Sequence, residues 1–202
     1  MESKEFIKNG DVFIRSLESE GDEKESRIVS GYAVKFESDS QNMGFIEVIK
    51  KGAITEQTIM NSDIFARLNH NEDTVLARSR YGEGSLALEL REDGLYYEFE
   101  APNTAVGDEL LEHLKRGEIT TSSFAFSLPI DGTGERWYRS EDGVLRKDIL
   151  KIDRLYDVSP VFEPAYLATT CSKRAMEVIE KSEELNKKYD ALMEDLHKYC
   201  IE

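Results

Sequence analysis

The feature that most constrains this chain is an alternation of apolar and polar residues on both sides of the dipeptide Asp93-Gly94. The alternating apolar residues are Leu86, Leu88, Leu90, Leu95, Tyr97 and Phe99. Successive side chains of a β-strand point to opposite faces, and Asp-Gly is a favoured hairpin turn. The pattern therefore predicts an antiparallel hairpin over residues 86–100, with one face buried and the other in contact with water.

Further runs rich in β-branched and aromatic residues predict more strands. They cover residues 12–17, 28–36, 45–49, 122–128 and 136–139, with one or two more strands within 149–161. Turn residues separate these short strands, which favours a barrel or a sandwich.

Two helices are predicted beside the strands. One lies within residues 52–60, and the other begins after Asn103 or Thr104, either of which can cap it, and stops at Gly117. The predicted fold class is mainly β with flanking helices.

The last part of the chain has a different pattern, with apolar residues three or four positions apart. They are Ala175, Val178, Leu185, Tyr189, Leu192, Leu196 and Tyr199. This spacing predicts a C-terminal amphipathic helix of about 25 residues, which either docks on its own domain or binds a partner helix. We therefore divide the 202 residues into an N-terminal strand and acidic loop (1–27), a β domain (28–170) and a helical tail (171–202).

Composition excludes several classes of protein. The chain has 26 Lys and Arg against 41 Asp and Glu, a net charge of −15, which argues against non-specific nucleic-acid binding. No apolar run approaches the ~20 residues that span a bilayer, and the N-terminus does not resemble a signal peptide, so we expect a cytosolic protein. Cys171, Cys200 and the three histidines lack the spacing of a metal site, so we expect neither metal nor cofactor.

A few residues could carry chemistry. His70 follows an apolar strand-like run and could project into a cleft, whereas His113 and His197 fit solvent-facing positions on helices. Ser122 and Ser123 begin a phenylalanine-rich strand, and a serine needs a base to become a nucleophile. Asp157 lies within an apolar strand, where it either orients a histidine or faces solvent. The Gly-x-Ser-x-Gly elbow of α/β-hydrolases is absent from the sequence.

Three motifs follow one another in the chain: Leu-Asn-His ending at His70, Gly-Glu-Ile-Thr-Thr-Ser-Ser-Phe-Ala-Phe starting at Gly117, and Leu-Tyr-Asp-Val-Ser-Pro-Val-Phe-Glu-Pro-Ala-Tyr starting at Leu155. In order and spacing they resemble the tailed-phage prohead serine proteases, which are related to the herpesvirus assemblins. The resemblance covers residues 31–170. It implies a β-barrel core flanked by helices.

The same resemblance implies a catalytic triad of His70, Ser123 and Asp157. Ser123 stands directly before the Phe-x-Phe strand, where the family has its nucleophile. The chain departs from the family at two points: Ser122 replaces a residue that is often bulky and apolar, and Asp157 replaces a residue that is often Glu.

The resemblance further implies a serine endopeptidase that processes the phage major capsid protein and its scaffolding region and also cleaves itself. It would act in the host cytoplasm inside the assembling prohead, and a homodimer is possible. The alternative is a non-enzymatic capsid assembly or scaffolding protein in which the three residues are incidental. The separation of His70 and Ser123 in the fold distinguishes the two hypotheses.

Overall fold

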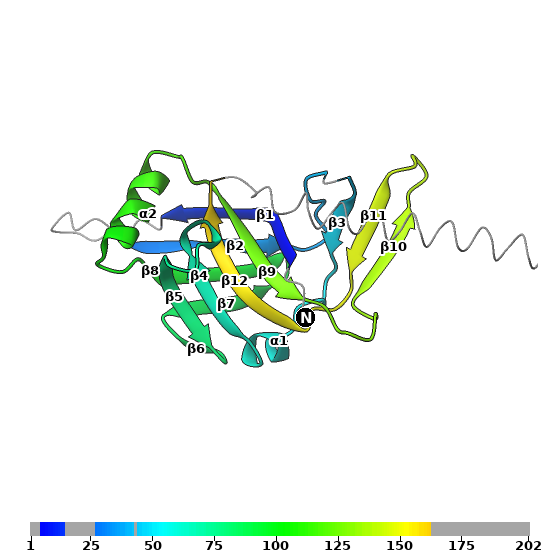
Figure 1. The fold of residues 1–202 in the computed structure, drawn as a ribbon, viewed down its shortest axis with the longest axis horizontal. Helices are drawn as coiled ribbons and strands as arrows, with labels where there is room; N and C mark the ends of the chain where they lie inside the picture. The colour runs from blue at the N-terminus through cyan, green and yellow to red at the C-terminus, as the bar shows by residue number, and fades with distance from the viewer. Residues whose placement is uncertain (1–4, 15–26, 43, 163–202) are drawn as a thin grey trace, which may run out of the picture. The chain divides into compact units, whose positions relative to one another are not determined.

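The computed structural model describes residues 5–14, 27–42 and 44–162, which form mainly strands with two short α-helices (Figure 1). The strands are β1 (Glu5–Ile14), β2 (Ile28–Lys35), β3 (Ile46–Ile49), β4 (Asp63–Arg67), β5 (Val75–Arg80), β6 (Glu83–Gly84), β7 (Leu86–Arg91), β8 (Gly94–Glu100), β9 (Thr121–Ser127), β10 (Glu135–Arg139), β11 (Leu145–Ile149) and β12 (Arg154–Val161). The helices are α1 (Glu56–Met60), α2 (Ala105–Lys115) and the 3₁₀ turn η1 (Leu68–His70).

Nine strands form one large sheet in the order β6-β5-β4-β12-β9-β1-β2-β8-β7. Strand β9 lies near its centre, antiparallel to both β1 and β12, while β12 runs parallel to β4 on its other side. Strands far apart in the sequence thus become neighbours, which brings the segments around residues 65, 123 and 157 side by side.

The large sheet is open, and the expected closed barrel is wrong for the described residues. The order of strands ends at β6 and at β7, without a ladder between them. Strand β6 has only Glu83 and Gly84, and both pair with β5, so it is too short to extend a hydrogen-bonded ladder to β7. The coarser prediction, a mainly β fold with helices beside it, is confirmed.

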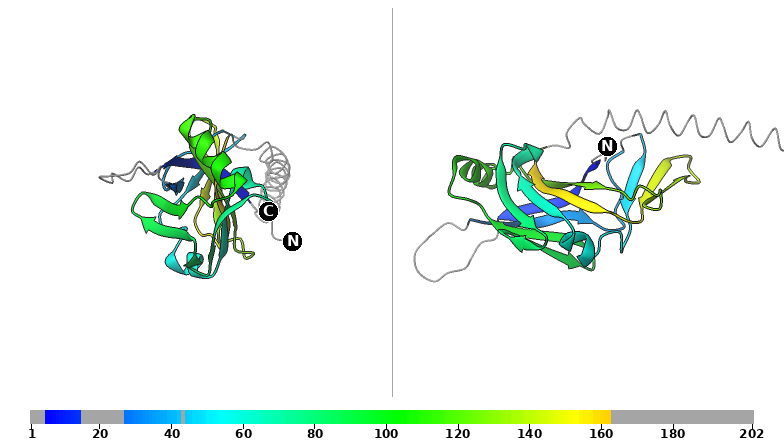
Figure 2. Two further views of the ribbon diagram at one scale, coloured as in Figure 1. Left: turned by 90° about the vertical axis from the view of Figure 1, so that its left-hand side faces the viewer. Right: turned by 60° about the horizontal axis from the view of Figure 1, so that its bottom comes forward.

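The core lies on one face of this sheet, which curves around it (Figure 2). Tyr97 and Phe99 from β8 meet Phe124 and Phe126 from β9, and all four are at least 98% buried. Strands β8 and β9 are not neighbours in the sheet, yet the hydroxyl oxygens of Tyr97 and Ser122 lie 2.6 Å apart. Side chains of β8 and β9 therefore meet across the concave face of the sheet and fill it, and β8 supports β9 from the core side.

A second sheet has three strands in the order β10-β11-β3. It contains a buried ion pair, in which Lys147 Nζ lies 2.9 Å from Glu47 Oε2 and 3.1 Å from Glu135 Oε2. The backbone N–H of Ile152 donates to the carbonyl of Ala53 at 2.8 Å and links the segment after this sheet to the loop before α1.

Both predicted helices are present and have side-chain caps. Thr55 caps α1 in a capping box with Thr58, and the Thr104 hydroxyl accepts the N–H of Gly107 at the start of α2. Gly117, with φ of 69°, follows the end of α2, in the left-handed region that favours glycine.

Most predicted strands are confirmed, with shifted ends. The hairpin forms β7 and β8, and β1 begins at Glu5, earlier than expected. Strand β5 was not predicted, and β11 begins before the predicted range 149–161. The C-terminal helix over 171–202 and the boundary at residue 170 lie outside the described residues, so the three-part division stays a prediction.

Candidate active site

His70 ends a turn of unusual backbone conformation. Directly after β4 the chain enters η1, where Asn69 and His70 have φ of 54° and 59°. This left-handed region is uncommon for non-glycine residues, and such residues cluster at functional sites. Backbone hydrogen bonds from Leu68 N to Thr74 O and from Asn71 N to Leu68 O, both 3.1 Å, hold the turn in place.

This turn directs the His70 ring to Asp157 on β12. The Nδ1 atom of His70 lies 2.8 Å from Asp157 Oδ1. A carboxylate only accepts hydrogen bonds, so Nδ1 carries the proton of this bond and, in the neutral ring, Nε2 holds the lone pair. A histidine oriented in this way presents Nε2 as a base.

Asp157 is 1% exposed and has two further side-chain partners. Arg67 at the end of β4 places Nη1 at 3.2 Å from Oδ2, and the hydroxyl of Ser159 donates to Oδ1. A buried carboxylate is costly unless it is paired and hydrogen-bonded. Asp157 meets both conditions and does not face solvent.

The two neighbouring serines of β9 lie on opposite faces of the sheet. Ser122 shares the core face with Phe124 and Phe126, and its Oγ lies 2.6 Å from the buried hydroxyl of Tyr97. Ser123 follows it in the strand and therefore points to the other face.

That other face is the one that carries Asp157. In the ladder between β9 and β12, Ser123 stands opposite Ser159, and Ala125 stands opposite Asp157. Directly opposite side chains share a face, and diagonal neighbours lie about 7–8 Å apart. Ser123 is thus the diagonal neighbour of Asp157 and lies on the same sheet face as the carboxylate that contacts the His70 ring.

Tyr97, the core residue beneath β9 that could ionise, stays protonated. Burial raises the pKa of Tyr97, because a phenolate would be costly in the apolar interior. Tyr97 therefore remains a neutral hydrogen-bond partner of Ser122 and supports β9 beneath Ser123.

The other histidines are apart from this arrangement. His113 lies on α2, where Nδ1 is 2.6 Å from Glu118 Oε2 and the ring packs edge-on against Phe162. His197 and both cysteines lie outside the described residues. Within the described part of the chain, no group of three metal-ligating side chains is present, and no helix is long and apolar enough to cross a membrane.

Four arginines lie between Ser123 and Asp157 in the sequence, and the first two, Arg136 and Arg139, are on β10 of the smaller sheet. There Arg136 Nη2 pairs with Asp148 Oδ2 at 2.5 Å. Neither arginine shares the sheet face of Ser123.

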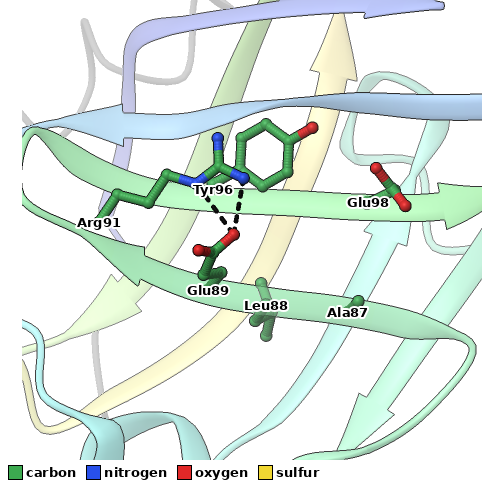
Figure 3. Close-up of a pocket in the computed structure, with 6 residues that line it drawn as sticks. All are labelled: Ala87, Leu88, Glu89, Arg91, Tyr96 and Glu98. Atoms are coloured by element: carbon green, nitrogen blue, oxygen red, sulfur yellow. Dashed lines mark hydrogen bonds and ion pairs between the residues drawn. The ribbon is translucent and has the colours of Figure 1, made fainter. Parts of the chain in front are cut away.

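A shallow hollow of about 350 Å³ lies elsewhere, on the outer face of β7 and β8 (Figure 3). Its lining residues are Ala87, Leu88, Glu89, Arg91, Tyr96 and Glu98. Arg91 lies 3.4 Å over the Tyr96 ring and pairs with Glu89. The lining contains no serine, cysteine or histidine, unlike the face of β9 and β12, which carries Ser123 and Asp157.

Sequence reasoning missed two residues of the site, Arg67 and Ser159. A signal for each was present: Arg67 is a charged residue in an apolar strand three positions before His70, and Ser159 lies two positions after Asp157 on the same strand face. The pairing of β4 with β12, which brings them together, is not visible in the sequence.

Comparisons with known proteins complete the description of the site. Residues 13–182 match the model of a family described as caudovirus prohead serine protease. Among solved structures, the chain is similar to the bacteriophage T4 capsid assembly protease, with 11% identity and a TM-score of 0.47 over 79% of this chain and 98% of that one. No curated protein matches the sequence.

Proposed function

Since the chain belongs to the caudovirus prohead serine protease family, we propose that it is an endopeptidase with Ser123 as nucleophile, His70 as general base and Asp157 as the residue that orients His70. The observation that carries this proposal is the pairing of His70 Nδ1 with Asp157 Oδ1 at 2.8 Å on the sheet face that also bears Ser123. A non-enzymatic assembly protein would have no need for this buried, strained arrangement.

The reaction begins when the Ser123 hydroxyl attacks a peptide carbonyl and His70 Nε2 removes the hydroxyl proton. Asp157 stabilises the imidazolium that forms. His70 then returns the proton to the leaving amine, the C–N bond breaks, and an acyl-enzyme remains. Water, deprotonated by His70, hydrolyses the ester and regenerates Ser123.

The substrates that the family suggests are the phage major capsid protein with its scaffolding region and the protease chain itself. Cleavage takes place inside the assembling prohead in the host cytoplasm. Peptide segments are bound in extended form, since main-chain hydrogen bonds to strands provide affinity that depends little on side chains.

The experiment is co-expression of the full chain with the phage major capsid protein, read as shortening of the capsid band on a gel. Ser123→Ala is expected to abolish shortening, because loss of a triad serine removes on the order of 10⁶ in turnover. Ser122→Ala, at the adjacent position on the opposite face, should leave substantial activity. Full processing by Ser123→Ala together with none by Ser122→Ala would move the nucleophile by one residue, and full processing by both would exclude the proposed triad.

A further inference from the structure

Arg67 provides Asp157 with a cationic partner of fixed charge. Its Nη1 lies 3.2 Å from Asp157 Oδ2, and the two side chains are only 14% and 2% exposed. His70 and Ser159 both bind the other carboxylate oxygen, Oδ1. Oδ1 of the Asp157 carboxylate therefore contacts a histidine and a hydroxyl, whereas Oδ2 contacts the guanidinium of Arg67.

The guanidinium of Arg67 packs on the ring of Phe65, the residue of β4 that lies between β12 and β5. Its Cζ lies 4.5 Å from the centroid of the Phe65 ring, and Phe65 stands opposite Asp157 on β12 and opposite Arg78 on β5. Arg78 also lies over this ring, at 4.6 Å, and is fixed by two hydrogen bonds to Asp63. Stacked guanidinium groups on an aromatic face are restricted in position as well as attracted to the ring.

The backbone of Arg67 reaches Asp157 as well. Its N–H donates to the Ser159 hydroxyl at 3.0 Å, and that hydroxyl in turn donates to Asp157 Oδ1. Ser159 is completely buried, so both of its hydrogen bonds are shielded from water. Side chain and main chain of one residue thus fix both oxygens of the carboxylate.

A general-base histidine must be neutral before the reaction starts. A neutral His70 gives the buried Asp157 a hydrogen bond but no counter-charge, and an unpaired buried carboxylate is costly. Arg67 removes this conflict because its charge does not depend on pH in the working range.

We propose that Arg67, with Ser159, is a positioning residue that keeps Asp157 charged and aligned while His70 is neutral, so that His70 is ready to act as a base. The proposal rests on the triad proposed above and adds a fourth and a fifth member that do not contact substrate. Strand β4 contributes Asp63 and Arg67 to this face, β5 contributes Arg78 and Arg80, β12 contributes Arg154 opposite Ser127, and β9 contributes the uncharged Ser123, Ala125 and Ser127.

The test measures how fast a fluorescent fluorophosphonate labels the full-length protein between pH 5 and 9. In this reaction the serine oxygen bonds to phosphorus, fluoride leaves, and the hydroxyl proton passes to the base. The probe reports activation of Ser123 without knowledge of the cleavage site. Ser123→Ala is measured in parallel: labelling that persists in this variant refutes the proposed triad, whatever Arg67 does.

For Arg67→Gln we expect the maximal labelling rate to fall roughly 10- to 100-fold, the size of effect that a displacement of about 1 Å in a catalytic group produces. The pH at which labelling reaches half its maximum should move upward, because protonated His70 then supplies the counter-charge that Arg67 gave to Asp157. Arg67→Lys keeps the charge and should restore the pH profile while recovering only part of the rate.

Arg78→Gln is the matched control, because Arg78 stacks on the same ring but does not touch Asp157. It should leave both the rate and the pH profile unchanged. If Arg67→Gln does not fold by circular dichroism, Ser159→Ala replaces it, with the same direction expected. An unchanged or lowered half-maximal pH, or equal losses in the Arg67 and Arg78 variants, would overturn the proposal and leave Arg67 as a structural ion pair between β4 and β12.

Discussion

Ser122 and Ser123 are chemically identical neighbours, but they lie in different environments because successive side chains of a strand point to opposite faces. Because Phe124 and Phe126 are core residues, Ser122 shares their face and hydrogen-bonds to Tyr97, whereas Ser123 shares the face of Asp157. The sequence contains this distinction, since alternation with phenylalanine is visible in it. The partners Arg67 and Ser159 could not be predicted, because they meet through the pairing of β4 with β12, between positions about ninety residues apart.

Asp157→Asn is the prediction that belongs to this scale. The imidazolium of the transition state loses its partner, so we expect the maximal rate to fall about 10²- to 10³-fold. The half-maximal pH should move downward, opposite to the direction expected for Arg67→Gln, because the charged imidazole is no longer favoured.

Rates of capsid-protein cleavage against pH for the parent and the variant decide this prediction. Asp63→Asn serves as the control, since Asp63 pairs with Arg78 on the same face but is partly exposed. Identical rates and profiles for the parent and Asp157→Asn would leave a dyad of Ser123 and His70 with another orienting group.

At the scale of elements, the sequence predicted those strands and helices whose formation depends on residues close together in the chain. The hairpin of β7 and β8 followed from alternation and an Asp-Gly turn, and α2 from Thr104 and Gly117 at its ends. Strand β5 was missed because Arg78 and Arg80 interrupt its apolar pattern. Arg78 pairs with Asp63 and lies over the Phe65 ring on β4, and Arg80 lies over the ring of Tyr81, the next residue in the chain. The order of strands in the sheet and its open edges depend on non-local pairing, which the sequence pattern does not encode.

The buried phenol of Tyr97, which joins β8 to β9 through its hydrogen bond with Ser122, makes the stability of the fold decrease at alkaline pH. Burial raises the pKa of Tyr97 above the value of about 10 for an exposed tyrosine. The folded state therefore retains a proton that the unfolded state releases. The resulting stabilisation is complete below pH ~10 and decreases as the pH rises further, by up to about 1.4 kcal/mol per pH unit.

Urea unfolding between pH 8 and 11 measures this dependence. Tyr97→Phe should lower the free energy of unfolding by about 1 kcal/mol at neutral pH and weaken its decrease above pH 10. Tyr96→Phe, one position away on the outer face, should keep the decrease of the parent protein. Equal slopes for the parent and Tyr97→Phe would show that Tyr97 does not control alkaline stability.

At the scale of the whole molecule, the N-terminal strand is part of the large sheet. Strand β1 lies inside it: residues 5–11 pair with β9, and residues 12–14 pair with β2. Strands β1 to β12 all fall within residues 1–165, which form one compact unit. The sequence predicted a strand near the N-terminus but not its central place, because one of its two partners, β9, is distant in the chain.

Two truncations should therefore have opposite effects. Deletion of residues 1–14 removes the strand between β9 and β2 and leaves both with unpaired backbone groups, so we expect loss of cooperative unfolding and of Ser123 labelling by the fluorophosphonate. Deletion of residues 172–202 keeps every strand that the structure describes and should leave a folded chain that labels at the parent rate, with weaker co-sedimentation with assembling capsids. Self-cleavage that preserves activity is then expected after β12 and not within β1. Unfolding of the second truncation would show instead that residues 172–202 complete the core, and a folded, active first truncation would show that the sheet closes without β1.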